Sequence, residues 1–416
     1  MIRIGIVGCG RILAAHLRGY RLLREAGFDG FRITALCSRK AEDAIGYVQR
    51  DGSTPQRPAV SNIPGDPLAI GDEFLSDFQP ETDVAVYTDY REMIASGKID
   101  AVNDFSTHAL HHQVADCAFT AGKHVLSQKP LAITVAAARR MCEEAERRKV
   151  TFGVFENFRQ APRTRQLRWA FESGLAGRVQ MFLLGYAGVW WGPDLIVADT
   201  PWRHLKSEAG GISLDLGVHF FDQLRHVAGD VATVSARCTV LEPRRVSRNA
   251  AGQVVREIEC DADDTFVAHL ETTAGAVGSL FASWGGHGGA VRTADGAVYY
   301  GSKARITGDE ITFDGRDPQK LADLYRSQAP GDLQQRHAPR GLDDSFALNQ
   351  LDWLQAVEQG TTPETSGREG LADLATAFAL LESDCSGRPV RVADVLEGRI
   401  RAFQQPLDEK FGLIRH

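Results

Sequence analysis

An acid and a histidine one helical turn apart are the clearest candidates for chemistry in this sequence. Asp215 and His219 lie within an apolar pattern of helical spacing from Leu214 to Leu224, and residues four apart share one face of a helix. A carboxylate at this spacing can fix the tautomer of an imidazole and stabilise its charged form. Gly210 and Gly211 precede the pattern and let another backbone or a ligand come close. The pattern fits a catalytic pair, and it fits equally a core helix whose histidine forms a buried hydrogen bond.

A glycine turn near the first residue predicts a phosphate site. Residues 2–7 have the composition of a short buried strand, Gly8 and Gly10 follow, and a helical pattern runs from 11 to 26. This order lays a pyrophosphate on a helix N-terminus: the first glycine makes the tight turn and the second lets the backbone approach the phosphates. The dinucleotide-binding fingerprint has a third small residue, glycine or alanine, three positions after the second glycine. Leu13 stands there instead, and this difference weakens the motif.

The residues after the second predicted strand bear on the choice of cofactor. That strand spans residues 31–37, and in a dinucleotide-binding fold its end faces the adenosine ribose, where an acidic residue marks NAD. Here Ser38, Arg39 and Lys40 follow. A hydroxyl and two cations suit a 2′-phosphate, so the sequence favours NADP over NAD. The alternative is that the two cations only begin a solvated helix.

Strands and helices alternate through the rest of the first 157 residues. The pattern predicts further strands at 84–87, 100–105, 124–127 and 151–155. Repeated β–α units of this length predict an α/β fold with a parallel, doubly wound sheet. Ligands of such sheets bind beyond the carboxyl ends of the strands, where Ser106, His111, Lys129 and Asn157 are expected.

Three histidines, His108, His111 and His112, raise the question of a metal site. No carboxylate or cysteine stands at a spacing that would complete a ligand set, so no metal is expected. A helix N-terminus beside the nicotinamide is the favoured place for these histidines.

The second half of the chain is rich in strands and contains aromatic residues next to an arginine. Trp190, Trp191 and Trp202 offer flat faces on which sugar rings pack, and Arg203 can donate to substrate hydroxyls. For any one of these tryptophans, a place in the core or at an interface is an equally good interpretation. Strand-like stretches are predicted at 179–189, 231–241, 254–271 and 276–284, and helices at 343–358 and 367–384.

Length and composition indicate two domains and an ordinary soluble protein. A chain of 416 residues exceeds one ordinary core. The expected division is 1–157, with a surface insertion at about 51–82, and 158–416, with 367–416 packing back on the first domain. Hydrophobic residues make up 43% and charged residues 24% of the chain, which is typical of globular proteins.

Charge, cysteine content and hydropathy limit the cellular compartments and the classes of partner that are expected. The formal net charge of −7 argues against a broad nucleic-acid surface. No apolar run is long enough to cross a membrane, and strand-like sequence at Ile2 leaves no room for a signal peptide. Seven scattered cysteines without a C-x-x-C pair fit reduced thiols, so a cytoplasmic location is expected.

Several short motifs, each weak alone, occur in an order that resembles one known family. They are Gly8-Cys9-Gly10, Thr88-Asp89-Tyr90 with Ile99-Asp100-Ala101-Val102, Ala121-Gly122-Lys123-His124-Val125, Lys129-Pro130-Leu131-Ala132, Glu156-Asn157-Phe158-Arg159, Trp202-Arg203, the Gly-Gly…Asp…His stretch and Gly387-Arg388-Pro389-Val390. Together they resemble the glucose–fructose oxidoreductase / inositol dehydrogenase (Gfo/Idh/MocA) family over nearly the whole chain.

The resemblance implies a fold and a catalytic set. It implies an N-terminal Rossmann domain and a C-terminal α+β domain with a large, mostly antiparallel open sheet, which commonly forms the interface of a homodimer or homotetramer. The family's catalytic lysine lies in a Glu-Lys-Pro motif and matches Lys129, with Gln128 in place of the glutamate. Its catalytic aspartate and histidine match Asp215 and His219. The cofactor loop matches Ser106-Thr107 loosely, since His108 follows.

The implied activity is reversible hydride transfer between nicotinamide and a secondary alcohol or ketone of a sugar, cyclitol or glycoside. His219 is expected to take the hydroxyl proton, Lys129 to place a charge near the alkoxide and help keep His219 neutral, and Asp215 to orient the hydroxyl or the imidazole. The expected cofactor contacts are Gly8, Cys9, Gly10, Arg11, Ile12, Ser38, Arg39, Lys40, Ser106, Thr107, His108, His111, Gln128, Lys129, Asn157 and Arg159. The expected substrate contacts are Lys129, Trp190, Trp191, Trp202, Arg203, Asp215 and His219.

Two alternative functions remain open on the same fold. One is a redox-neutral sugar epimerase, lyase or glycosidase that uses a tightly bound nicotinamide. The other is a non-catalytic cofactor-binding scaffold or sensor, which would not need Lys129, Asp215 and His219 together.

Overall fold

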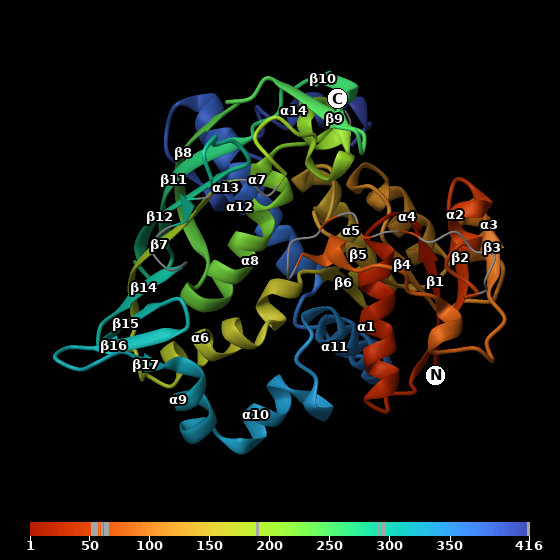
Figure 1. The fold of residues 1–416 in the computed structure, drawn as a ribbon, viewed down its shortest axis with the longest axis horizontal. Helices are drawn as coiled ribbons and strands as arrows, with labels where there is room; N and C mark the ends of the chain where they lie inside the picture. The colour runs from red at the N-terminus through yellow and green to blue at the C-terminus, as the bar shows by residue number, and fades with distance from the viewer. Residues whose placement is uncertain are drawn as a thin grey trace. The chain divides into compact units, whose positions relative to one another are not determined.

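The chain folds into two units, each with a large sheet of its own (Figure 1). The structure is a computed structural model that describes residues 1–50, 57, 59, 61, 66–188, 191–289, 291–292 and 297–413. The first unit comprises Met1–Ile133, Ala137–Ala161 and Gln335–Leu371, and the second comprises Thr134–Ala136, Pro162–Gln334 and Ala372–His416. The boundary predicted at residue 157 therefore lies close to the change at Ala161. Residues 335–371, placed by that boundary in the second domain, belong to the first unit.

The first unit contains a parallel sheet of six strands in the order β3-β2-β1-β4-β5-β6, which confirms the doubly wound α/β prediction. The strands are β1 (Ile2–Val7), β2 (Phe31–Cys37), β3 (Ala85–Tyr87), β4 (Ala101–Asp104), β5 (His124–Gln128) and β6 (Phe152–Phe155). The helices are α1 (Leu13–Glu25), α2 (Ala41–Ile45), η1 (Pro67–Ala69), η2 (Leu75–Asp77), α3 (Tyr90–Ala95), α4 (His108–Thr120), α5 (Val135–Arg148), η3 (Asn157–Gln160), η7 (Pro339–Gly341) and α11 (Ser345–Gln359). Ile6 and Val7, which point to opposite faces of β1, are both buried, as expected for a sheet covered on both faces.

Helix α11 belongs to the first unit because its apolar face packs on α1. Trp353 is fully buried and its indole nitrogen donates to the carbonyl oxygen of Val125 over 3.1 Å. The Gln350 amide donates to the carbonyl oxygen of His16 over 3.0 Å. Asp344 caps the helix by accepting from the backbone N–H groups of Phe346 and Ala347. A helix from late in the chain thus completes the core beneath the glycine turn.

The second unit contains a mixed sheet of ten strands in the order β17-β16-β15-β14-β7-β12-β11-β8-β18, with β13 paired to β7. Only the β7–β12 pair is parallel among the described pairings, so the mostly antiparallel prediction is confirmed. The strands are β7 (Val179–Ala187), β8 (Val231–Thr239), β11 (Thr265–Thr272), β12 (Val277–Ser283), β13 (Val291–Arg292), β14 (Val298–Gly301), β15 (Ala304–Thr307), β16 (Glu310–Phe313), β17 (Gln319–Lys320) and β18 (Val390–Arg391). A separate hairpin pairs β9 (Arg244–Arg248) with β10 (Val254–Glu259).

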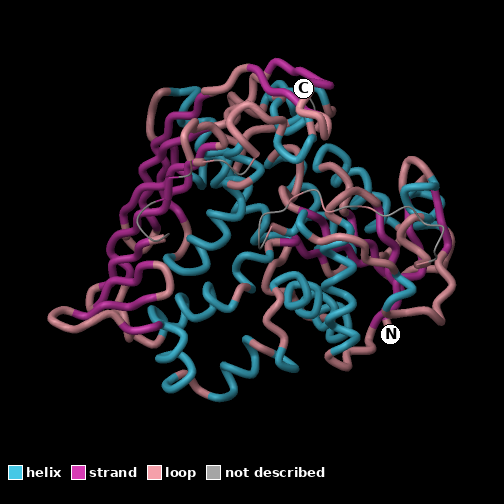
Figure 2. Tube along the Cα trace, viewed as in Figure 1, coloured by secondary structure: helices cyan, strands magenta, loops and turns pink. Residues whose placement is uncertain are grey.

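Helices lie along one face of this sheet, as the strands in magenta and helices in cyan of Figure 2 show. The helices of the second unit are α6 (Pro162–Glu172), η4 (Val197–Asp199), η5 (Pro201–His204), η6 (Lys206–Glu208), α7 (Ile212–Asp215), α8 (Gly217–Ala228), α9 (Leu321–Gln328), α10 (Gly331–His337), α13 (Val392–Leu396), α14 (Gln405–Lys410) and α12 (Gly367–Ser386); α10 ends, and α12 begins, in the first unit. Strand β11 alternates along its length: Phe266 and Leu270 are buried, whereas Val267, His269 and Glu271 face outward. One face of the sheet therefore carries the core and the other is open.

Two further properties concern the whole described chain. All seven cysteines lie in it and are free. No helix in the described residues is both long and apolar enough to span a bilayer.

Candidate active site

Gly8 and Gly10, in the turn after β1, are glycines for different structural reasons. Gly8 has a φ of +98°, and a Cβ there would lie 2.6 Å from the carbonyl carbon of Phe105, so the end of β4 excludes any side chain. At Gly10 a Cβ would meet no atom within 4 Å. The first glycine is thus required by the packing of the chain, while the second leaves the space through which a backbone approaches a diphosphate. This geometry fits a dinucleotide at the N-terminal side of α1.

The other residues of this turn are divided between core and surface. Leu13, the departure from the fingerprint, is fully buried and begins α1. Cys9 is buried, and its thiol donates to the carbonyl oxygen of Cys37 over 3.7 Å. Burial raises the pKa of Cys9 to about 12, so it remains a thiol. Arg11 is exposed and Ile12 half-buried.

The cationic pair beyond β2 lies at the surface. Arg39 and Lys40 are exposed, whereas Ser38 is half-buried and its hydroxyl donates to Asp43 over 3.4 Å. Asp43 lies in the first turn of α2. Exposure leaves both cations accessible to a phosphate, and it also suits a solvated helix start, so the NADP preference stays a prediction.

Beyond β4, a buried carboxylate holds the turn that includes Ser106. The backbone N–H and the hydroxyl of Ser106 both donate to Oδ1 of Asp104, over 3.0 and 2.6 Å. Burial raises the pKa of Asp104, while Ser106 and the charge of His111 oppose the rise. Thr107 follows as the exposed N-cap residue of α4, and His108 is buried.

His111 connects the turn beyond β4 to the loop beyond β5. Its Nδ1 lies 3.1 Å from the carbonyl oxygen of Pro130 and 3.2 Å from that of Leu131, and its Nε2 lies 3.3 Å from that of Ser106. All three neighbouring atoms are carbonyl oxygens, which only accept. A ring nitrogen of His111 can therefore bond to them only when it carries a hydrogen. His111 is fully buried and positions the segment that directly follows Lys129.

The neighbouring histidine is held in its neutral form. Burial, with the charges of Arg140 and His111, lowers the pKa of His112 to about 4. Within the described part of the chain, no group of three or more His, Cys, Asp and Glu residues could hold a metal ion.

Gln128 and Lys129 lie where β5 ends. The side-chain oxygen of Gln128 accepts from the backbone N–H of Lys129 over 2.7 Å, and its amide nitrogen donates to Nε2 of His16 over 3.0 Å. Burial lowers the pKa of His16 well below its usual value, so this acceptor stays neutral. Gln128 pairs with Phe155 across β5 and β6. Lys129 therefore neighbours Glu156, a buried acid to which the sequence motifs assigned no role, although it directly follows the predicted strand at 151–155.

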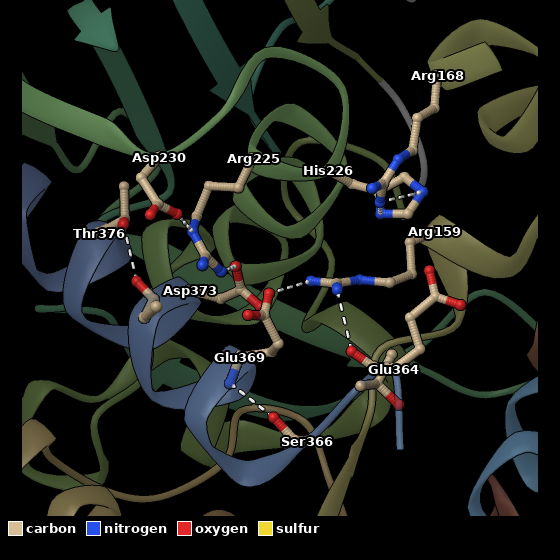
Figure 3. Close-up of polar contacts among 12 residues, drawn as sticks. Arg159, Arg168, Arg225, His226, Asp230, Glu364, Ser366, Glu369, Asp373 and Thr376 are labelled. Atoms are coloured by element: carbon tan, nitrogen blue, oxygen red, sulfur yellow. Dashed lines mark hydrogen bonds and ion pairs between the residues drawn. The ribbon is translucent and has the colours of Figure 1, made fainter. Parts of the chain in front are cut away.

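Asn157 and Arg159, expected as cofactor contacts, have partners within the first unit. The Asn157 amide donates to the Ser345 hydroxyl over 2.9 Å. Arg159 is only 4% exposed, donates to the Glu364 carbonyl oxygen over 3.2 Å and pairs with Glu369 over 3.0 Å (Figure 3). Both side chains therefore fasten the segment after β6 to later parts of the chain.

In the second unit, Gly210 and Gly211 allow close packing of the chain. A Cβ on Gly210 would lie 2.5 Å from the carbonyl oxygen of Trp202. Gly211 has a φ of +114°, and a Cβ there would collide with the Asp263 carboxylate. Gly211 N–H also donates to the Arg203 carbonyl oxygen over 2.8 Å. The close approach anticipated at these glycines is therefore made by protein groups.

The predicted helix that carries the acid and the histidine is in fact two short helices. Helix α7 ends at Asp215 and α8 begins at Gly217, because Leu216 departs from helical geometry with φ −103° and ψ −30°. Asp215 and His219 are 5% and 7% exposed, so both lie inside the unit. Arg203 donates from Nε to Oδ2 of Asp215 over 3.0 Å. An arginine predicted to contact substrate thus holds the predicted catalytic acid.

The aromatic residues near Arg203 are placed unevenly. Trp202 is half-buried, with the Arg203 guanidinium 4.3 Å from its ring centroid. Trp191 is half-buried, and Trp190 lies outside the described residues.

His204 is a positioning residue that the motifs did not reveal. It is buried, and its Nε2 accepts from the Val197 N–H over 3.0 Å. Burial, with nearby Arg245 and Arg203, lowers the pKa of His204 to about 3, so the acceptor nitrogen is unprotonated. His204 ends η5, the short helix that carries Trp202 and Arg203. Only its place directly after those residues could have drawn attention to it.

Two family models match successive parts of the chain. "Oxidoreductase family, NAD-binding Rossmann fold" matches residues 68–156, and "GFO/IDH/MocA C-terminal domain" matches residues 164–313. The chain belongs to the Gfo/Idh/MocA family. Its first unit is accordingly the family's NAD-binding Rossmann fold.

Curated relatives and a solved structure of Gfo/Idh/MocA type align over most of the chain. Myo-inositol 2-dehydrogenase of Thermotoga maritima is 26% identical over 95% of this chain and 100% of its own. D-apiose dehydrogenase of Paraburkholderia graminis is 26% identical over 93% of this chain and 88% of its own. The fold is similar to that of levoglucosan dehydrogenase in complex with NADH and L-sorbose, with a TM-score of 0.72 and 21% identity over 94% of this chain and 98% of that chain.

Proposed function

We propose that this Gfo/Idh/MocA protein is an NAD(P)-dependent dehydrogenase that oxidises a secondary alcohol of a sugar, cyclitol or glycoside. The observation that carries the proposal is the open glycine turn at Gly10, with Lys129 beyond the carboxyl end of β5 in the same sheet. Ligands of doubly wound sheets bind at these strand ends. The relatives named for inositol and apiose support this substrate class.

Each proposed role follows from the chemistry of a side chain. When bound, the nicotinamide would supply the hydride acceptor. His219 takes the hydroxyl proton as general base. Lys129 stabilises the developing alkoxide by its positive charge. Asp215, held by Arg203 over 3.0 Å, orients the substrate hydroxyl or the imidazole.

The two units divide the work in this proposal. The first unit binds the cofactor through the turn from Gly8 to Ile12 and the segment from Ser38 to Lys40, whose two exposed cations favour NADP. The second unit binds the substrate, with Trp202 and Arg203 beside Asp215.

The open sheet face of the second unit supports a homodimer or homotetramer. Its large exposed apolar side chains are Met181, Leu183, Val267 and Val277, and Val277 pairs with Met181 across neighbouring strands. Apolar patches of this kind mark protein interfaces.

The test measures reduced nicotinamide by absorbance with NADP⁺ or NAD⁺ and a panel of hexoses, inositols, sugar acids and glycosides. Lys129→Ala and His219→Ala should each lower kcat by about 10²–10⁴-fold, the range of acid–base and charge-stabilisation effects. Matched controls are Lys98→Ala and His287→Ala, both at exposed positions, which should keep wild-type turnover. Near-normal turnover in the first two variants would refute the assignment.

A further inference from the structure

Glu156 is a buried acid directly beyond the carboxyl end of β6. The last residues of β5 and β6, Gln128 and Phe155, are paired in register. Lys129 and Glu156 are therefore the next residues along two neighbouring parallel strands, whose backbones run about 4.8 Å apart. An acidic and a basic residue therefore follow neighbouring strands at the same edge of the sheet.

The charges around Glu156 come from Lys129 and from η3. Glu156 is 1% exposed, and the charged groups that act on it are Lys129 and, more weakly, Arg159. The terminal nitrogens of Arg159 also donate to the Glu364 carbonyl oxygen and to the Glu369 carboxylate. Of the two cations, Lys129 has the larger electrostatic effect on the Glu156 carboxyl group.

The neighbour of Lys129 on its own strand carries no charge. Gln128 stands where the resembled motif has a glutamate, and its amide group is occupied by the Lys129 N–H and the neutral His16 ring. The carboxyl group nearest to Lys129 along the sheet edge is therefore that of Glu156, which follows β6, because Gln128 at the end of β5 has none.

We propose that Glu156 is the positioning residue of Lys129 and supplies, from the next strand, the carboxyl group that Gln128 lacks. The catalytic part of this inference rests on the proposed dehydrogenase function, whereas the pairing of the two side chains does not. Glu156 acts through Lys129 and touches no reacting atom in this proposal.

The pairing has a consequence for protonation. Burial raises the pKa of Glu156 to about 8, and Lys129 and Arg159 oppose the rise. Below that pH the carboxyl group is neutral and the charge of Lys129 is not compensated by it. Above that pH a carboxylate faces the ammonium and weakens its field at an alkoxide. Glu156 thus makes the electrostatic effect of Lys129 dependent on pH.

The first experiment needs no turnover. Infrared difference spectra of the full-length protein follow the carboxylic-acid C=O band as the pH rises, and Glu156→Gln assigns the band. In Lys129→Met, the band should disappear about one pH unit or more above the wild-type midpoint, because a nearby cation favours the carboxylate. The control Lys98→Met, at an exposed lysine of the same unit, should leave the midpoint unchanged. An unchanged midpoint in Lys129→Met would overturn the pairing, whether or not the protein is a dehydrogenase.

The second experiment tests the role in turnover. Glu156→Gln cannot ionise, so it should remove the fall of kcat near pH 8, with little change in KM. Gln128→Glu in the Glu156→Gln background should return a titration to the kcat profile by returning a carboxyl group to the lysine. A wild-type kcat and pH profile in Glu156→Gln would overturn the role, as would lower stability with an unchanged pH profile. Absence of dehydrogenase activity in the wild type would refute the proposed function and leave the infrared result intact.

Discussion

The candidate site residues of the two units are positioned by different means. In the first unit, Lys129 and Glu156 follow two parallel strands, and strand register alone makes them neighbours. In the second unit, Asp215 is held by Arg203, which extends from a short helix that passes close to Gly210. The first arrangement tolerates changes in the surrounding loops, whereas the second depends on close contacts between segments distant in the sequence.

The largest effect on stability should come from replacing a glycine of each unit by alanine. Gly211→Ala should destabilise the second unit by roughly 2–4 kcal/mol, because its φ is +114° and a Cβ would collide with the Asp263 carboxylate. Gly10→Ala meets no atom within 4 Å and should change the free energy of unfolding by less than about 0.5 kcal/mol. Urea unfolding of the two variants measures the contrast.

The Gly10 variant should differ from the Gly211 variant in a second property, the affinity for the cofactor. Gly10→Ala should weaken binding of the nicotinamide dinucleotide, measured by titration, because the added methyl group enters the space left for the diphosphate. If Gly10→Ala instead unfolds the protein, the turn is held by packing like Gly8, and the contrast between the units is lost.

Mild acid should weaken the turn that carries Arg203. The pKa of His204 is lowered to about 3 in the folded state, against about 6.5 when unfolded. The unfolded chain therefore binds more protons between these values, so His204's contribution is complete above about pH 6.5 and is lost as the pH falls towards 3. The slope is about 1.4 kcal/mol per pH unit for this one histidine.

A variant separates that contribution from those of His16 and His112 in the first unit, whose pKa values are also lowered. His204→Gln offers an amide oxygen to the Val197 N–H and cannot titrate. It should reduce the slope of the unfolding free energy against pH between about 4 and 6 by about 1.4 kcal/mol per pH unit, measured by urea titration at several pH values. An equally steep dependence in the variant would show that His204 does not limit stability in acid.

The sequence was sufficient to predict the parallel sheet and the place of Lys129 beyond one of its strands. Residues 2–7 and 31–37 are mostly apolar and end in unbroken apolar residues, which is typical of buried parallel strands. Polar groups directly after such strands are expected at one edge of the sheet. Glu156 directly follows the predicted strand at 151–155, so the same rule could have found it. Its place beside Lys129 could not be predicted, because strand pairing and register are not visible in one sequence.

The second unit was harder to predict because its details depend on long-range packing. Nothing in the helical pattern around Asp215 indicates that Leu216 interrupts it, or that Arg203 is the partner of the acid. The sequence predicts a helix over 343–358, yet its place on α1 is decided by tertiary contacts such as that of Gln350 with His16. An amphipathic pattern predicts that a face is buried and does not identify the surface that buries it.

The smallest effect concerns the surface cations of the first unit, which depend on neither close packing nor register. Arg39→Ala should weaken NADP binding about fivefold and leave NAD binding unchanged, since an exposed charge contact contributes up to about 1 kcal/mol. High salt should also reduce the preference of the wild-type protein for NADP over NAD, because salt screens exposed charges. Arg147→Ala, at an exposed arginine of α5, is the control for net charge. Equal weakening of NAD and NADP would mean that Arg39 does not read the 2′-phosphate, and the two cations would then be only the start of a solvated helix.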